Sequence, residues 1–258
     1  SLALSFHSWN GMGTWTWVGI RNYEEYIIRD PVFRQVLGNT LLYWVMLVPG
    51  MLFMALFMAM AVNLPRLRLK GIFRTSFILP YVTSSVSVVI VFLNILDDQV
   101  GWLNYVFGLL GMARVPFLRS MAWSKVSVSL LVIWQWVGYN MVIMLAGLQS
   151  IPQELYEAGM IDGANGWRRF AHITLPLMRP VLLFAFVMST IGTFNMFSEP
   201  FLLTRGGPGS SSATLTTLLY STAFSYSRFG AGAALSFLIA ALIFAASAMQ
   251  IKLSTREA

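Results

Sequence analysis

The sequence predicts an all-α protein, a polytopic bundle of transmembrane helices. Hydrophobic residues make up 57% of the 258 residues, charged residues only 10%, and the mean hydropathy is +0.69. Such a chain has more apolar surface than one soluble core can bury. Five apolar stretches are long enough to cross about 30 Å of hydrocarbon, which needs roughly 20 helical residues. The ~10-residue alternation typical of transmembrane strands is absent from the sequence.

The composition also argues against several function classes. The absence of cysteine excludes disulfides, thiolate metal sites and cysteine nucleophiles. The two histidines, His7 and His172, are too few and too badly placed for a metal site or a catalytic triad. The net charge of +7 is typical of a membrane protein whose basic residues face the cytosol, so we expect no nucleic-acid partner.

The first 35 residues precede the first complete span. Ser1–Phe6 is interpreted as the end of a preceding span, which would make a sixth span before residue 1. From Trp9 to Arg34 the chain is polar and aromatic, which predicts an external segment. Aromatic side chains such as Trp15 and Trp17 are suited to the depth of the lipid headgroups.

The predicted spans are approximately Val36–Leu64, Ile72–Leu96, Trp123–Leu148, Leu177–Phe197 and Phe229–Ile251. Pro49 and Pro80 should bend or interrupt the first two, since each proline removes one helical hydrogen bond. The kinks could surround a cavity or could have no role in a pathway. Small residues on one side of the last span predict close helix packing, either inside the bundle or between subunits.

The connections alternate between the two sides of the membrane. Asp97–Trp123 is predicted to be external and to hold a short interfacial helix, and the glycine- and serine-rich segment after the fourth span is predicted to be an external loop. The other connections carry clustered basic residues, which predicts a cytosolic side. These basic residues are Arg66, Arg68, Lys70, Arg74, Arg168, Arg169, Arg179, Lys252 and Arg256. Residues 252–258 are then a cytosolic tail.

The cytosolic connection from residue 150 to 176 is predicted to be structured. Ser150, Pro152 and Gln153 fit a capping box that starts a helix, and Gly163 is a plausible terminator. Asn165 can cap a second short helix, which Thr174–Pro176 should end as the next span begins.

These two helices have too little apolar surface to bury their large side chains. The exposed side chains are expected to be Tyr156, Met160, Trp167 and Phe170. Such a surface favours a partner protein. The alternative is a hairpin that lies on the headgroups with its arginines on anionic lipid.

The segment "EAGMIDGANGWRRFAHITLP" resembles the EAA loop of binding-protein-dependent ABC importer permeases. The pattern is E-A-A, three residues, G, nine residues, I-x-L-P, and Gly159 is the one departure, where the family usually has alanine. The resemblance implies a cytosolic coupling helix seated in a groove of an ATPase subunit. The coupling residues that it implies are Glu157, Ala158, Gly159, Asp162, Gly163, Ile173, Leu175 and Pro176.

The similarity extends over the whole chain. "GNTLLYW", "ILPYV", "LAGLQSIPQELYEA", "LTRGGPG" and "AFSYSRFGAGAALS" together resemble the MalF-like sugar permeases. The resemblance implies a permease domain over 36–251 with the fold of a type I importer, in the cytoplasmic membrane of a bacterium or archaeon.

The resemblance also implies a set of partners. They are a second, MalG-like permease, two ATPase subunits that bind ATP and Mg²⁺, an extracytoplasmic sugar-binding protein, and a sugar substrate. The chain itself has no phosphate-binding G-x-x-x-x-G-K-[ST] loop, so we expect it to bind no cofactor and to have no catalytic residue.

Polar and aromatic residues in the spans could contact a sugar in the pathway. The candidates are Thr83, Ser84, Tyr139, Asn140, Asn195 and Glu199. The same hydroxyls and amides could instead make bonds between helices, and the aromatic residues could be lipid anchors.

Two alternative functions stay open at this stage. One is a secondary transporter driven by an ion gradient, although the chain has essentially no charged residue in mid-span. The other is an importer permease for a solute other than a sugar, such as glycerol phosphate.

Overall fold

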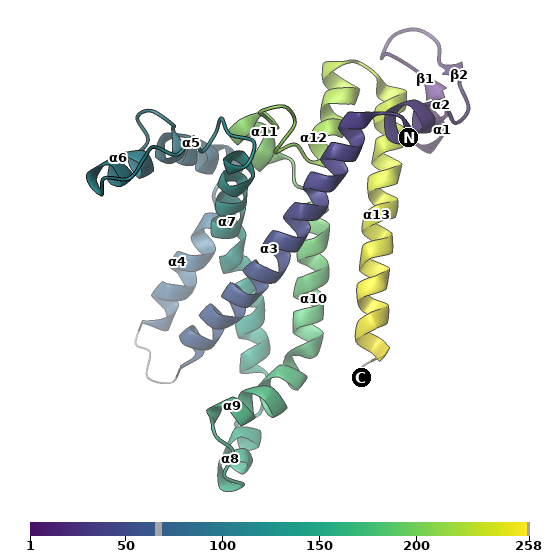
Figure 1. Ribbon diagram of the computed structural model, residues 1–258. Coiled ribbons are helices and arrows are strands. Elements are labelled where there is room, and N and C mark those ends of the chain that lie inside the picture. The colour runs from purple at the N-terminus through teal and green to yellow at the C-terminus, as the bar shows by residue number, and fades with distance from the viewer. Residues whose placement is uncertain (65–68, 257–258) are drawn as a thin grey trace. The chain divides into compact units, whose positions relative to one another are not determined.

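The computed structural model describes residues 1–64 and 69–256, with side chains through Ser254. Figure 1 shows that the chain is mainly helical. It divides into two compact units. Unit 1 comprises residues 1–47, 84–132 and 190–249, and it contains the predicted external connections. Unit 2 comprises residues 48–83, 133–189 and 250–258, and it contains the predicted cytosolic connections. Of the predicted cytosolic arginines, Arg66, Arg68 and the side chain of Arg256 lie outside the described residues.

Most of the predicted spans form as single helices. Within the described ranges, four helices are long and apolar enough to cross a membrane. They are α3 (Pro31–Asn63), α7 (Trp123–Gln149), the helix from Gly166 to Phe194 that ends with α10 (Leu175–Phe194), and α13 (Phe229–Arg256). Pro49 lies inside α3 without ending it.

The second predicted span, Ile72–Leu96, is not one continuous helix. It consists of α4 (Lys70–Val82) and α5 (Ser85–Leu96), with extended backbone at Thr83 (ψ 142°) and Ser84 (ψ 127°). The break comes three residues after Pro80, so the proline itself stays helical. Both the amide and the hydroxyl of Thr83 donate to the carbonyl of Leu79, at 3.1 and 2.8 Å, which closes α4. Side chains of serine and threonine compete for backbone groups in this way.

The core of unit 1 joins the first part of α3 to the segments around α10 and α13. Phe33, Val36, Phe194, Leu215 and Leu235 are almost fully buried together. The helices that complete this region are α11 (Ser198–Thr204), α12 (Leu215–Tyr220) and the π-helix η3 (Ser221–Ser225). Thr214 caps α12 in a capping box with Thr217.

The glycine- and serine-rich segment after α11 is a loop, as predicted, and α3 holds it by its backbone. The Nδ2 of Asn39 donates to the carbonyls of Ser210 and Ala213 at 2.8 and 3.1 Å. The Nε2 of Gln35 donates to the carbonyl of Gly209 at 2.7 Å. These bonds satisfy loop carbonyls that would otherwise need water, so the loop has a defined path.

The connection after α5 contains the predicted short helix, α6 (Trp102–Leu109). Asn104 fixes the return of the chain, because its amide exchanges hydrogen bonds of 2.9 and 2.8 Å with the backbone of Val115. The backbone amides of Val100 and Gln99 donate to Asp97 and hold the pKa of this carboxyl below its ordinary value of 3.8.

The N-terminal segment includes a small sheet that the all-α prediction lacked. Its elements are α1 (Leu2–Ser5), β1 (His7–Ser8), β2 (Thr16–Trp17), α2 (Arg21–Tyr23) and the π-helix η1 (Glu24–Ile28). The two strands pair antiparallel. The buried Asn22 donates to the carbonyls of Ser5 and His7 at 2.8 and 3.0 Å. A polar side chain therefore fastens the segment, and hydropathy carries no signal for such a bond.

The small residues predicted at the start of the last span are packed inside unit 1. A Cβ on Gly230 would collide with the carbonyl oxygen of His7, and one on Gly232 would lie 2.6 Å from the Cβ of Ala223. Farther along α13, Ala240 and Ala241 are exposed. The glycines thus allow a close approach within the chain.

The core of unit 2 is formed by the second part of α3, by α7 and by the start of α10. Ala55, Ala59, Met141, Met144 and Met178 are almost fully buried in it. Flexible methionine side chains fill irregular space between helices well. This core positions the predicted cytosolic loop that follows α7.

Candidate functional site

The loop after α7 begins with α8 (Gln153–Ile161), whose start differs from the predicted capping box. The hydroxyl of Ser150 donates back to the carbonyl of Gly147 at 2.8 Å, and the N-cap position of α8 is Pro152. Ser150 therefore serves the end of α7. Gln153 does not reach back either, because its amide donates to Glu157 at 3.1 Å.

The end of α8 follows the prediction. Gly163 has a left-handed backbone (φ 76°), and its amide donates to the carbonyl of Met160 at 3.1 Å. The amide of Ala164 donates to the carbonyl of Gly159 at 2.8 Å. This pair of bonds is a Schellman motif, which favours glycine at the left-handed position.

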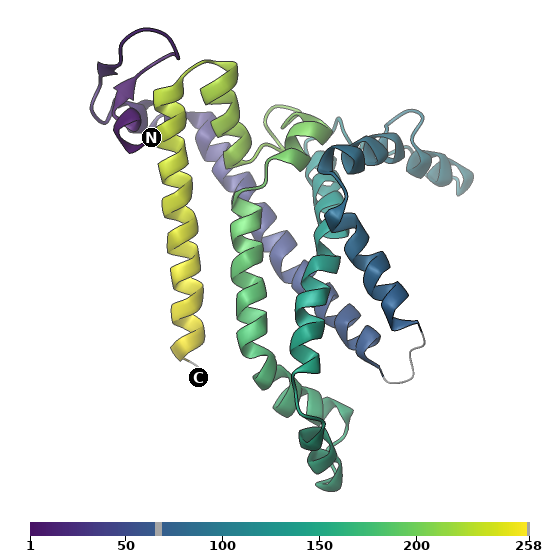
Figure 2. The same cartoon turned by 180° about the vertical axis from the view of Figure 1, so that it is seen from behind.

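Asn165 caps α9 (Gly166–Arg169), as predicted, since its Oδ1 accepts from the amide of Arg168 at 2.9 Å. The predicted end of this helix at Thr174–Pro176 is wrong. The π-helix η2 (Phe170–Thr174) joins α9 directly to α10 (Figure 2). Pro176 lacks an amide hydrogen, and its ring would crowd a regular α-helical turn. The wider turn immediately before it gives the ring room.

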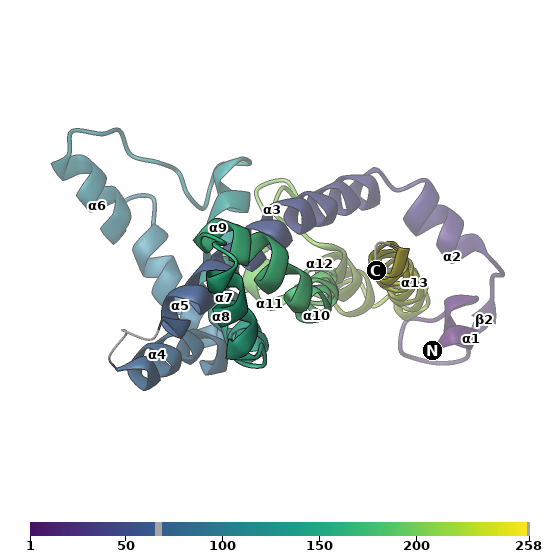
Figure 3. The same ribbon diagram turned by 90° about the horizontal axis from the view of Figure 1, so that it is seen from below.

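The two arms of the loop are braced against each other. The hydroxyls of Tyr156 in α8 and Thr174 in η2 are 2.9 Å apart. A Cβ on Gly159 would lie 3.1 Å from the Cδ1 of Ile173 and 3.5 Å from the Cγ of Arg169. The glycine that departs from the E-A-A pattern therefore lies at a close contact between α8 and the second arm. Figures 1 and 3 show α8 and α9 side by side.

The loop presents several large apolar side chains to its surroundings. Their exposed fractions are 42% for Leu155, 52% for Met160, 87% for Ile161 and 73% for Trp167. Tyr156 and Phe170, which we predicted to be exposed, are half-buried. Folding inside this chain thus leaves an uncovered apolar surface on α8 and α9.

The residues of the E-A-A pattern lie on both arms. Glu157, Ala158, Asp162 and Gly163 are exposed on α8 and its end, next to Ile161. The other arm carries the half-buried Ile173 and the exposed Leu175 and Pro176. The structure therefore places the sequence pattern and the exposed apolar residues on the same loop.

A second set of candidates lies in unit 2, around α7. The ring of Tyr139 stacks on that of Tyr81 from α4, with centroids 4.5 Å apart, and Trp136 meets Tyr81 edge-on at 5.1 Å. Asn140 is 1% exposed and accepts a 3.3 Å hydrogen bond from Ser189. Thr83, the third candidate of this unit, is exposed where α4 ends. We missed Tyr81, although it directly follows the noted Pro80.

The remaining candidates belong to unit 1. Ser84 is exposed at the start of α5, and Asn195 is exposed with its amide bonded to the carbonyl of Ile191 at 3.0 Å. Glu199 is 6% exposed in α11, a helix that packs against α5. Within the described residues, no group of three or more His, Asp or Glu side chains is arranged to hold a metal ion.

The sequence matches a family of known transport proteins. Residues 51–256 match the model of the family described as "binding-protein-dependent transport system inner membrane component". The chain belongs to this family. It is therefore a multi-pass inner-membrane component of a transport system, and the predicted family and location are confirmed.

Relatives of this inner membrane component carry names of carbohydrate transporters. The chain is 38% identical to the lactose transport system permease protein LacF of Rhizobium radiobacter, over 97% of this chain and 85% of LacF. It is 34% identical to the arabinooligosaccharides transport system permease protein AraP of Bacillus subtilis, over 94% of this chain and 77% of AraP.

A solved structure shows the same fold. It is the crystal structure of a bacterial ABC transporter involved in the import of the acidic polysaccharide alginate. The TM-score is 0.83 at 23% identity, over 93% of this chain and 84% of the solved chain. The predicted helical fold of an ABC importer permease is confirmed.

Proposed function

We propose that this inner membrane component is a permease subunit of an ATP-driven sugar importer. It forms half of a translocation pathway with a second, related permease. Two ATPase subunits bind and hydrolyse ATP with Mg²⁺, and an extracytoplasmic binding protein delivers the sugar. The chain transmits the motion of an ATPase through the loop from residue 150 to 176.

The observation that carries the proposal is the exposed apolar surface of this loop. Ile161 and Trp167 are 87% and 73% exposed, although the loop is capped at Asn165 and closed at Gly163. A folded segment that exposes large apolar side chains beside the E-A-A pattern fits a protein groove better than water. The bond between Tyr156 and Thr174 allows both arms to move together when a partner pushes one of them.

The aromatic group of unit 2 supports a sugar as the substrate class. Tyr81, Tyr139 and Trp136 form a cluster of aromatic side chains, the residue type that contacts the apolar face of a pyranose. Asn140 and Ser189 provide amide and hydroxyl groups in the same unit. The names of the relatives, lactose and arabinooligosaccharide permeases, point to the same substrate class.

Two charge changes in the loop test the coupling role. Glu157→Lys reverses a charge, and Gly163→Asp adds one at the left-handed end of α8. Each variant should assemble in the membrane and lower sugar uptake and coupled ATP hydrolysis at least about tenfold, which corresponds to about 1.4 kcal/mol. The measurements are uptake in vesicles and ATP hydrolysis by the purified complex. The matched control is the charge reversal Arg114→Glu. Arg114 is exposed in the predicted external connection, so this variant should keep both activities. Full activity of either loop variant would contradict the coupling role.

The same uptake assay separates the two alternatives. Uptake that needs no ATPase subunit and stops with an ionophore would favour an ion-gradient transporter, which the family description does not favour. If glycerol phosphate inhibited uptake and no sugar did, the substrate would be a solute other than a sugar.

A further inference from the structure

A cavity of about 690 Å³ lies in unit 2, between the cytosolic loop and the last turns of α3 and α7. Met60 and Asn63 line it from α3, and Leu148 and Gln149 line it from α7. The loop contributes Gln153 and Arg169. The three segments that meet here all lie at the predicted cytosolic boundary of the membrane.

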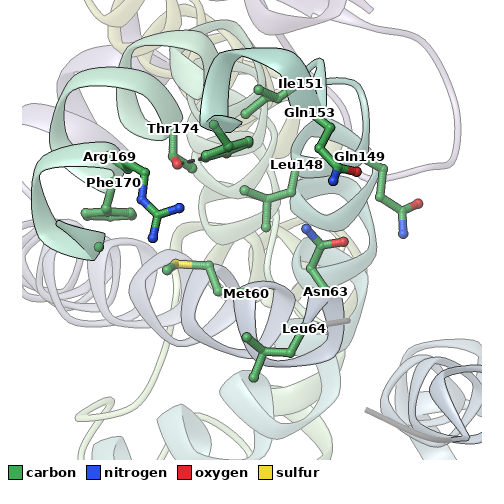
Figure 4. A pocket seen from close by; sticks show the side chains of 12 residues that line it. Met60, Asn63, Leu64, Leu148, Gln149, Ile151, Gln153, Arg169, Phe170 and Thr174 are labelled. Carbon is green, nitrogen blue, oxygen red and sulfur yellow. Dashed lines mark hydrogen bonds between the residues drawn. The ribbon is translucent and has the colours of Figure 1, made fainter. Parts of the chain in front are cut away.

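The polar part of the lining consists of three amides, one guanidinium, and the hydroxyls of Tyr156 and Thr174, which bond to each other. Figure 4 shows the amides of Asn63, Gln149 and Gln153 on one side of the cavity and the guanidinium of Arg169 on the other. None of the described residues that line it is acidic. The buried Nε of Arg169 has no hydrogen-bond partner among residues 1–64 and 69–254. A buried, charged donor of this kind favours an anionic acceptor.

The rest of the lining is apolar. Met60 and Leu148 lie between the amides and the guanidinium (Figure 4). A small hydrophilic anion would gain nothing from these side chains, whereas an amphiphile satisfies both parts of the wall. Its phosphate would face the guanidinium, the polar remainder of its headgroup would face the amides, and its first methylene groups would cover the apolar side chains between them.

We propose that this cavity binds the headgroup of an anionic phospholipid of the cytosolic leaflet, with Arg169 as the main phosphate contact. The lipid would lie between α3, α7 and the loop, and would therefore hold the loop against the ends of the two spans. The binding itself does not depend on the proposed transport function, because its measurement requires neither substrate nor ATP.

The test is native mass spectrometry of the purified full-length chain, titrated separately with phosphatidylglycerol and with zwitterionic phosphatidylcholine. We expect one phosphatidylglycerol to be retained in preference to phosphatidylcholine. Arg169→Gln should weaken its binding about fivefold, the effect expected from one basic side chain at a lipid phosphate. Arg168→Gln, which removes the same charge from an exposed neighbour outside the cavity, should leave it unchanged.

Three results would overturn the proposal. They are equal binding of the two lipids by the unaltered chain, equal loss in the Arg168 and Arg169 variants, and complete displacement of the lipid by millimolar inorganic phosphate, which would identify a free anion as the ligand. If Arg169→Gln fails to fold, Gln149→Leu provides a second test. Gln149 is exposed at the end of α7, and its replacement removes one uncharged donor. Unchanged lipid retention in that variant would also count against the site.

Discussion

Gly138 lies at a close approach of two helices of unit 2, α7 and α4. A Cβ on this residue would collide with the carbonyl oxygen of Phe77, so only glycine lets α7 and α4 pack at this separation. The following residue, Tyr139, stacks on Tyr81 of α4. One missing methyl group therefore positions the aromatic rings that we propose to contact sugar.

Replacing this glycine should separate the two helices. We expect Gly138→Ala to destabilise the chain by at least about 1 to 3 kcal/mol, the usual cost of overpacking, because the carbonyl of Phe77 is backbone and cannot rotate away. Thermal unfolding in detergent measures this loss. Gly192→Ala in α10 is the matched control, since a Cβ there meets open space. A loss of the same size in both variants would show that close packing at Gly138 is not the cause.

At the scale of the element, the sequence correctly predicted the ends of helices where the capping residue had only one backbone group to bond. Asn165 and Gly163 both have the predicted roles, because a side-chain cap and a left-handed backbone depend on neighbouring residues alone. The prediction that Ser150 caps α8 was wrong, because its hydroxyl could bond at either the end of α7 or the start of α8. The end at Thr174–Pro176 was wrong because a π-helical turn accommodates the proline.

Contacts between distant segments could not be read from the sequence. The stack of Tyr81 on Tyr139 joins residues 58 positions apart, and the bonds from Asn39 to Ser210 and Ala213 join segments more than 170 positions apart. Hydropathy located the spans, but it does not specify which polar side chain reaches which backbone group. The break at Thr83 is accompanied by a local bond, from its hydroxyl to the carbonyl of Leu79, which hydropathy does not register either.

The cap at Asn165 should make a measurable contribution to the stability of α9. Asn165→Ala should destabilise the start of α9 by about 0.5 to 2 kcal/mol, because the amide of Arg168 loses its acceptor. Hydrogen exchange of that amide should accelerate accordingly. In contrast, Ser150→Ala should leave exchange in α8 unchanged, since Ser150 does not cap that helix. Faster exchange in α8 of the Ser150 variant would support the original capping box instead.

For the whole molecule, the membrane orientation is the main prediction. The orientation is predicted from the alternation of the spans and from the clustered basic residues. The chain has no cysteine to interfere with labelling. We expect Arg114→Cys to react with a membrane-impermeant maleimide added to intact cells. Met160→Cys, 52% exposed in α8, should react only after the membrane is opened. Labelling of both positions from the same side would rule out this orientation.

The prolines that follow the braced loop determine where α10 can bend. Pro176 and Pro180 lie four residues apart, so two successive turns each lack an amide donor, directly after the widened turn of η2. The bond between Tyr156 and Thr174 ties α8 to η2 just before this point. We therefore expect bending to occur in the short stretch of backbone that contains the two prolines. A thrust applied to α8 would accordingly flex α10 near residues 176–180 before it deformed the loop.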